Sequence, residues 1–298
     1  MSYLDDINKA IIKSQSTRSK ILSDELIKYR TAYKQTTGKI QNLIAIYNEN
    51  TSQNLKTLFR PIEKEIRILN SKLTKSAQAA IGKASRDAIV ETKASLSMLS
   101  GNLKAGAKIG MTGEVFDKVW KRAVAKIMKG IHGIELSTAI WDLNQASYRG
   151  IRRIIAKGYT DGLYVSEIMK NIKGFLYLPD VDMRTTYWKK FFEENPPGRG
   201  VYKSAYKNME RLLRTEVTRA YREATAEYAS QKKWVKGLKW NRTTGIGECA
   251  ECDEYANSDM YGLGDGVYPP SAIPISHPNC MCYLTIEPRE ESVIIDNV

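Results

Sequence analysis

Proline is almost absent from the first 178 residues of this 298-residue chain: Pro61 is the only one before Pro179, and the other eight fall at 179–288. A proline inside a helix removes a backbone hydrogen bond and clashes with the preceding turn, so a stretch without proline can run as long helices. Near the C-terminus two short extended runs, 238–242 and 283–287, are separated by turn-forming residues. The sequence therefore predicts a mainly α protein, with a long helical N-terminal extension and a helical body followed by a small α+β end module.

The spacing of apolar residues and glycines predicts how this layout divides. We expect a variable helical extension at 1–110, a helical body at 111–236 and a small Cys/His end module at 237–298. Apolar residues three and four apart, with a glycine past the last one, mark the expected body helices. These helices are expected at 115–127, from about 140 to Gly158, at 165–173 and at 203–236, with a helix-breaking connection at 177–201 and a hinge at Gly101–Gly113.

The extension carries one apolar seam along a helical face. Pro61 lies inside it and predicts a kink or the first turn of a new helix. A seam this narrow buries little area, so we expect the helix to be loosely held in the free chain and fixed by self-association or by docking on another protein. The seam consists of Leu55, Leu58, Ile62, Ile66, Leu69 and Leu73.

Charge divides the chain into a basic body and an acidic end. The formal net charge is +13. Residues 1–110 and 111–236 each carry +10, whereas residues 237–298 carry −7. A basic surface attracts polyanions because binding releases condensed counterions, which indicates DNA, RNA or an acidic protein as a partner. The alternative is a lysine-rich, solvated helix surface with no ligand.

No apolar run approaches the roughly 18 residues that a membrane span needs. The N-terminus, Met1 to Asp6, also lacks a basic segment followed by an apolar stretch. We therefore expect no membrane span and synthesis in a cytoplasm, where thiols stay reduced.

All four cysteines and one of the two histidines fall within 249–282. The pair Cys249 and Cys252 has the spacing of a metal-binding knuckle, and a second cluster, His277-Pro-Asn-Cys280-Met-Cys282, can complete a tetrahedral site. The sequence predicts a structural zinc ion, and the choice among His277, Cys280 and Cys282 stays open. A catalytic zinc would need an open position, whereas five candidate ligands over-fill a tetrahedron and no His-Glu-x-x-His segment is present.

Three other roles for the cysteines compete with metal binding. A redox pair is opposed by the acidic residues around the knuckle, which disfavour thiolates unless a cation is present. Two disulfides formed after release from the cell, or plain buried cysteines, remain open. The acidic residues are Glu248, Glu251, Asp253 and Glu254.

Several motifs follow one another in a fixed order along the chain. They are Arg214-Thr215-Glu216 with Arg219 and Ala220 one turn on, then Trp240, Cys249-x2-Cys252 and His277-Pro-Asn-Cys280-x-Cys282. Their order and spacing resemble the Mu F-like head morphogenesis family of tailed bacteriophages. The resemblance covers roughly 135–287 and departs from the family's usual pattern at Met281, where Arg is common, and at the turn Tyr255-Ala256-Asn257.

The resemblance implies a minor capsid protein of the virion, present in few copies and associated with the portal side of the head. Its implied roles are head morphogenesis and viral genome ejection, with the portal protein, other head proteins and phage DNA as partners. Its implied location is the head interior or portal region, after assembly in the host cytoplasm. The family module has no established enzymatic activity, so we expect a protein that is not an enzyme.

Arg214, Glu216, Arg219 and Trp240 are expected to brace the Cys/His module. Glu216 and Arg219 are spaced to pair along a helix, which alone is worth a few tenths of a kcal/mol when exposed. If the helix packs on the module, Arg214 or Glu216 can instead hold a loop there through charge-assisted hydrogen bonds.

Two other functions compete with the head protein. The first is a zinc-dependent nucleic-acid enzyme or toxin-like transferase with Glu216 and His277 as acid and base, against which stands the lack of a phosphate-binding glycine loop and of paired metal-binding carboxylates. The second is a zinc-ribbon nucleic-acid binder, which the −7 charge of the end module opposes.

Overall fold

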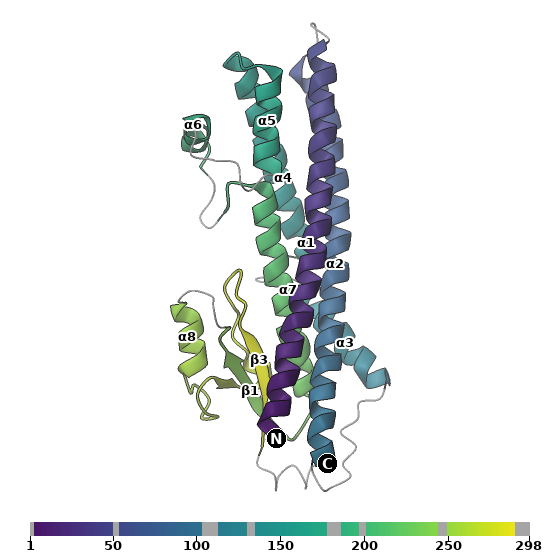
Figure 1. The fold of residues 1–298 in the computed structure, drawn as a ribbon, viewed down its shortest axis with the longest axis vertical. Helices are drawn as coiled ribbons and strands as arrows, with labels where there is room; N and C mark the ends of the chain where they lie inside the picture. Colours follow the sequence, from purple (N-terminus) through teal and green to yellow (C-terminus); the bar gives the residue numbers. More distant parts are fainter. Residues whose placement is uncertain are drawn as a thin grey trace. The chain divides into compact units, whose positions relative to one another are not determined.

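The protein is mainly α-helical with a small C-terminal sheet, as predicted (Figure 1). The computed structural model describes residues 3–49, 54–102, 113–129, 135–177, 186–196, 201–243 and 249–289. Among these residues no helix is both long and apolar enough to cross a bilayer.

The described residues contain eight α-helices, one short 3-10 helix and three strands. The helices are α1 (Tyr3–Glu49), α2 (Leu55–Asn102), α3 (Gly113–Met128), α4 (Leu136–Thr160), α5 (Val165–Leu176), α6 (Thr186–Glu194), α7 (Ala205–Ala229) and α8 (Ala250–Asn257), with η1 at Pro270–Ala272. The strands are β1 (Val235–Asn241), β2 (Val267–Tyr268) and β3 (Tyr283–Pro288).

The chain forms two compact units that cut across the three expected segments. Unit 1 comprises Met1–Ser23, Gln78–Gly133 and Leu213–Val298, and unit 2 comprises Asp24–Ala77 and Ile134–Leu212. Helices α1, α2 and α7 each contribute residues to both units. Composition changes along the chain could not reveal this division, because long helices bring together segments that are distant in sequence.

Unit 2 is built on an antiparallel pair formed by the parts of α1 and α2 that belong to it, which lie side by side in Figure 1. The Tyr29 hydroxyl donates to the Leu73 carbonyl at 3.2 Å, and Lys39 pairs with Glu65 at 2.8 Å. Helix α4 joins the pair through Asn144, which donates to the Asn70 side chain at 3.0 Å. These contacts join α1, α2 and α4 around one helical core.

The apolar seam predicted to dock on a partner belongs to this core. Leu58, Ile62, Ile66, Leu69 and Leu73 are 0–3% exposed, and Leu55 is half-buried. The expectation of an open docking face is therefore corrected: α1 and its neighbours cover the seam within the chain. Pro61 lies inside α2, which begins at Leu55, so it does not start a new helix.

Unit 1 carries the small sheet. Its strand order is β2-β1-β3, antiparallel throughout, with Leu238 opposite Ile286 in one pairing and Tyr268 in the other. Helix α8 packs on β1, and α3 is held through Trp120, whose ring N–H donates to the Gly82 carbonyl at 3.0 Å. The sheet and α8 form the Cys/His end module (Figure 1).

Two expected boundaries are wrong. The helix expected at 203–236 ends at Ala229, because the chain turns and Trp234 accepts a 2.9 Å backbone hydrogen bond from Arg289, so tertiary pairing overrides the local helix pattern. The connection expected at 177–201 contains α6, whose Trp188 and Phe191 are buried. The expected hinge is described only to Asn102, where α2 ends, and from Gly113, where α3 begins.

Candidate metal centre

The first candidate knuckle, Cys249 with Cys252, lies at the start of α8. Cys249 is the N-cap of this helix, and its sulfur accepts a hydrogen bond from the Cys252 backbone N–H at 3.4 Å. An N-cap side chain turns back toward the first free N–H groups of its helix. The cap geometry therefore brings both sulfurs of the Cys-x2-Cys pair to the same end of α8.

The second knuckle is a tight turn from His277 to Cys280. The Cys280 N–H donates to the His277 carbonyl at 3.2 Å, and Asn279 has a positive φ of 63°. Asparagine tolerates this left-handed conformation better than most residues. The Asn279 N–H donates to the Thr215 hydroxyl at 3.1 Å, which fixes the turn against α7.

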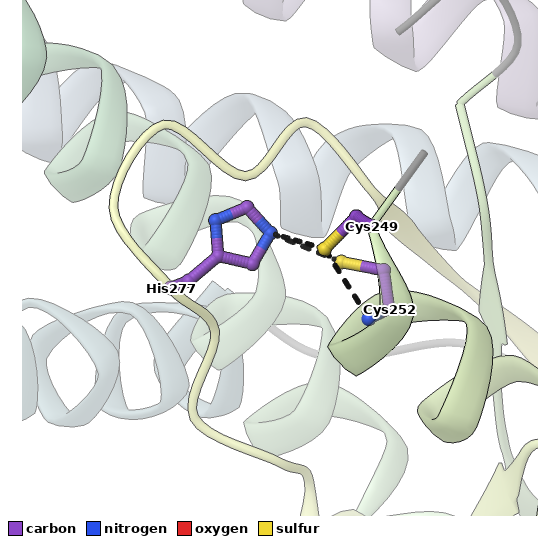
Figure 2. Close-up of side chains that lie close together, drawn as sticks. All are labelled: Cys249, Cys252 and His277. Atoms are coloured by element: carbon purple, nitrogen blue, oxygen red, sulfur yellow. Dashed lines mark hydrogen bonds between the residues drawn. The ribbon is translucent and has the colours of Figure 1, made fainter. Parts of the chain in front are cut away.

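The two knuckles bring their side chains together. The Nε2 atom of His277 lies 3.2 Å from the Cys249 sulfur and 3.1 Å from the Cys252 sulfur, and its ring edge points at both (Figure 2). The Cys252 sulfur also lies 3.6 Å from that of Cys280. Ligand atoms on a tetrahedral zinc ion are about 3.5–3.8 Å apart. The sulfur–sulfur distance falls in this range and the two nitrogen–sulfur distances are slightly shorter, so the cluster is compact enough for one metal ion.

The candidate ligands form two overlapping triads that share Cys252. One contains Cys249, Cys252 and His277, and the other contains Cys252, Cys280 and Cys282; within each, the ligand atoms lie within 4.8 Å of one another. All four cysteines are free thiols. The five predicted ligand residues therefore meet, and this cluster could bind a metal ion.

The histidine is held in the form that a metal needs. Its Nδ1 atom lies 2.9 Å from the Pro278 carbonyl oxygen. A carbonyl only accepts, so Nδ1 carries the proton and Nε2 presents its lone pair to the two sulfurs.

The thiols of Cys252, Cys280 and Cys282 differ in acidity. A hydrogen bond from Cys282, together with the nearby Arg222 guanidinium, lowers the pKa of Cys280 to about 4. Burial raises the pKa of Cys252 to about 12, and the bond to Cys280 and burial raise the pKa of Cys282. A coordinated cation would deprotonate its thiol ligands outright, so metal binding here would release protons.

Arg222 and Arg18 hold the loop that carries the last two cysteines. Arg222 donates from Nη2 to the Cys280 sulfur at 3.0 Å and to the Cys282 carbonyl at 2.7 Å. Arg18, from α1, donates to the Met281 carbonyl at 2.9 Å. Neither arginine was predicted. Arg222 follows Thr215 by seven residues and so shares its helical face, which is a signal in the sequence, whereas nothing marks Arg18.

The four residues expected to brace the module lie in different surroundings. Trp240 is 1% exposed and packs edge-to-face on Tyr255 beside the cysteines. Glu216 pairs with Arg219 at 3.4 Å, and Arg219 also donates to the Ile127 carbonyl of α3. Arg214 is exposed. Of the four, only Trp240 belongs to the apolar cluster around the cysteines.

The acid and base of the competing enzyme hypothesis have separate partners. Glu216 is buried beside Arg219, and burial raises the pKa of its carboxyl although Arg219 lowers it. His277 faces the sulfurs of Cys249 and Cys252. The contacts of the two residues therefore give no support to an acid–base pair.

The fold and the cluster together define a mainly helical protein with a small C-terminal Cys/His module that could hold a metal ion. Comparison of the chain with known protein families, curated proteins and solved structures finds no match.

Proposed function

We propose that this chain is a structural, non-enzymatic minor head protein of a tailed phage, located at the portal side of the head, whose end module is folded around one zinc ion. The observation that carries the proposal is the convergence of Cys249, Cys252, His277, Cys280 and Cys282 in one small core. Without a metal, a small module of this kind has little apolar area to stabilise it.

Zinc is the metal that suits these ligands. Thiolate and imidazole donors in a tetrahedral arrangement favour zinc over magnesium or calcium, which prefer oxygen. A site with more protein ligands than a tetrahedron needs has no open position for water, and this favours a structural role over a catalytic one.

The phage assignment draws on the order of the motifs that resemble the Mu F-like family. The Arg214-Thr215-Glu216 and His277-Pro278-Asn279-Cys280 segments, 64 residues apart at Thr215 and Asn279, meet through the hydrogen bond between those two residues. This contact supports treating the family-like segments as one structural module.

The charge division supports a contact with DNA. Residues 1–110 and residues 111–236 each carry a net charge of +10 and would bind packaged DNA without sequence preference. Residues 237–298 carry a net charge of −7 and would be repelled by DNA. We infer docking on the portal or other head proteins, with roles in head assembly and genome ejection. Because the seam in α2 is buried, the docking face must be a different surface.

Mass spectrometry and elemental analysis of purified particles from the phage that encodes the chain test this proposal. We expect the chain in intact heads in few copies. Its loss from ejected heads would identify a delivered protein, and its retention a structural one. The purified protein should contain about one zinc per chain. Absence of the chain from intact heads would refute the phage assignment. An end module that is folded but contains no metal would refute the proposed zinc site.

A further inference from the structure

We propose that Arg222 selects Cys280 as the fourth ligand of the zinc ion, beside Cys249, Cys252 and His277, and that Cys282 stays outside the coordination shell. This inference rests on the zinc proposed above. It makes Arg222 a positioning residue, which acts on the metal through the Cys280 sulfur.

The spacing of the two turns favours Cys280. Cys249 and Cys252 are separated by two residues, as are His277 and Cys280, and the second turn is closed by the hydrogen bond from the Cys280 N–H to the His277 carbonyl. Two such knuckles present four ligands that face one another in pairs. Cys282 lies outside this repeat and directly precedes β3, so the sheet sets its backbone.

The distances agree with the spacing. The Cys280 sulfur lies 3.6 Å from that of Cys252, which is the separation expected for two sulfurs on one zinc ion, about 3.5–3.8 Å. Cys252 in turn lies 3.1 Å from the His277 Nε2 atom. Cys280 and Cys282 form a second triad with Cys252, so the Cys280 sulfur must move toward Cys249 and His277 before these four ligands can hold one ion.

Arg222 treats the two cysteines differently. Its Nη2 donates to the sulfur of Cys280. To Cys282 it donates at the backbone carbonyl, from Nε at 3.1 Å and from Nη2 at 2.7 Å. An N–H donor favours the charged form of a sulfur and so favours metal binding through that sulfur. The rigid guanidinium fork fixes the Cys280 sulfur relative to the Cys282 backbone.

The charges of the loop's surroundings fit a site rich in thiolates. Arg222 and Arg18 are 5% and 3% exposed, and in the described part of the chain neither forms an ion pair with a carboxylate. Buried cations need anions nearby. Zinc with three thiolates and one neutral imidazole carries one net negative charge, which supplies such a partner.

Cobalt binding to the full-length protein tests this assignment. Co²⁺ replaces zinc as a spectroscopic probe, and its sulfur-to-cobalt charge-transfer absorption reports how many thiolates bind. The decisive pair of variants is Cys280→Ser and Cys282→Ser. Arg222→Met tests the positioning role, and Arg219→Met is its matched control, because Arg219 is on the same helix but donates to Ile127 of α3.

We expect Cys282→Ser to keep the three-thiolate spectrum and Cys280→Ser to lose one thiolate's share of the absorption. Arg222→Met should lower metal affinity about 10- to 100-fold, as removal of other hydrogen-bonding partners of ligands does, while Arg219→Met leaves it unchanged. Arg222→Lys, which keeps the charge but not the fork, should recover part of the affinity.

Two results would overturn the inference while leaving the zinc itself in place. The first is a cobalt spectrum that loses one thiolate in Cys282→Ser but not in Cys280→Ser. The second is equal metal affinity of the Arg222→Met and Arg219→Met variants. Failure of the unmodified protein to bind either zinc or cobalt would instead refute the proposed zinc site. If Arg222→Met does not fold, the two cysteine variants and Arg222→Lys still decide the ligand.

Discussion

The guanidinium carbon of Arg222, on α7, lies 4.4 Å from the centroid of the Trp240 ring, on β1. The same guanidinium group donates to the Cys280 sulfur and the Cys282 carbonyl. One buried cation therefore joins the helix, the sheet and the cysteine loop. A desolvated cation over an indole ring is worth about 2 kcal/mol, so this contact contributes to the stability of the whole end module.

Replacing Trp240 tests the energetic weight of that contact. Trp240→Ala should cost about 3–5 kcal/mol, because the residue is 1% exposed and would leave a cavity. Trp240→Phe should cost less, because it keeps an aromatic ring under Arg222 and loses only part of the buried indole, including an N–H that has no hydrogen-bond partner among the described residues. Native-state hydrogen exchange of the β1 and β3 amides measures both losses. Equal losses would show that stacking on the ring contributes little.

Metal removal should loosen α1 as well as the end module. A structural zinc contributes on the order of 10 kcal/mol to folding, so a chelator should expose the amides of β1, β3 and α8 to exchange. Because Arg18 donates to the Met281 carbonyl, protection near Arg18 should fall with them. Cys249→Ser should reproduce the effect. If exchange near Arg18 is the same with and without metal, the contact does not transmit the metal's stabilisation to α1.

Glu216 should make stability fall as pH rises. Burial, partly offset by Arg219, raises the pKa of its carboxyl in the folded protein, so folding favours the neutral form. The stabilisation is complete below the usual glutamate pKa of about 4.3 and is lost as the pH rises through the raised value. Melting temperatures measured across this range should fall for the unmodified protein relative to Glu216→Gln, which stays neutral. The opposite trend would show that the ion pair with Arg219 outweighs burial.

The buried seam in α2 predicts a loss of stability on substitution. Ile66→Ala should cost about 2–5 kcal/mol, because this side chain is 0% exposed. Ile27→Ala on α1 is the control: Ile27 is 62% exposed, so its loss should change stability by no more than about 0.5 kcal/mol. Hydrogen exchange of the α2 amides provides the comparison. Similar small effects for both variants would mean that the seam is not part of the core.

DNA contact by the basic body predicts a steep salt dependence. Arg149 and Arg153 are exposed on α4, one turn apart. Their joint replacement by Gln should lower the slope of log affinity against log salt by about 1 to 2 for duplexes of any sequence. Lys239→Gln in the acidic module is the control and should leave the slope unchanged. If the unmodified protein shows no retention on DNA at low salt, the basic surface is only solvated.

Much of the fold could be predicted because its signals are local. The helix expected to end at Gly158 ends at Thr160, and the one expected at 165–173 ends at Leu176. The apolar period marks such helices wherever they pack. The burial of the seam could not be predicted, because the residues that cover it lie on α1, whose apolar repeats are weak.

The candidate metal ligands could be predicted for a different reason. Cysteine and histidine at knuckle spacing are chemically distinctive, so Cys249, Cys252 and His277 stand out in the sequence. Arg18 does not, because it donates to a backbone carbonyl, and any residue has a carbonyl. Arg222 is marked only by its helical spacing from Thr215, which does not reveal that it donates to the Cys280 sulfur.

The composition of unit 1 sets the order in which the chain can acquire its native structure during synthesis. Its first stretch, Met1–Ser23, emerges from the ribosome long before its last, Leu213–Val298. Contacts between such distant segments form slowly, because the intervening chain must first be closed into a loop. Arg18 therefore lacks its Met281 partner until the 263 positions that separate them have been translated, so this contact between α1 and the cysteine loop can form only late in synthesis.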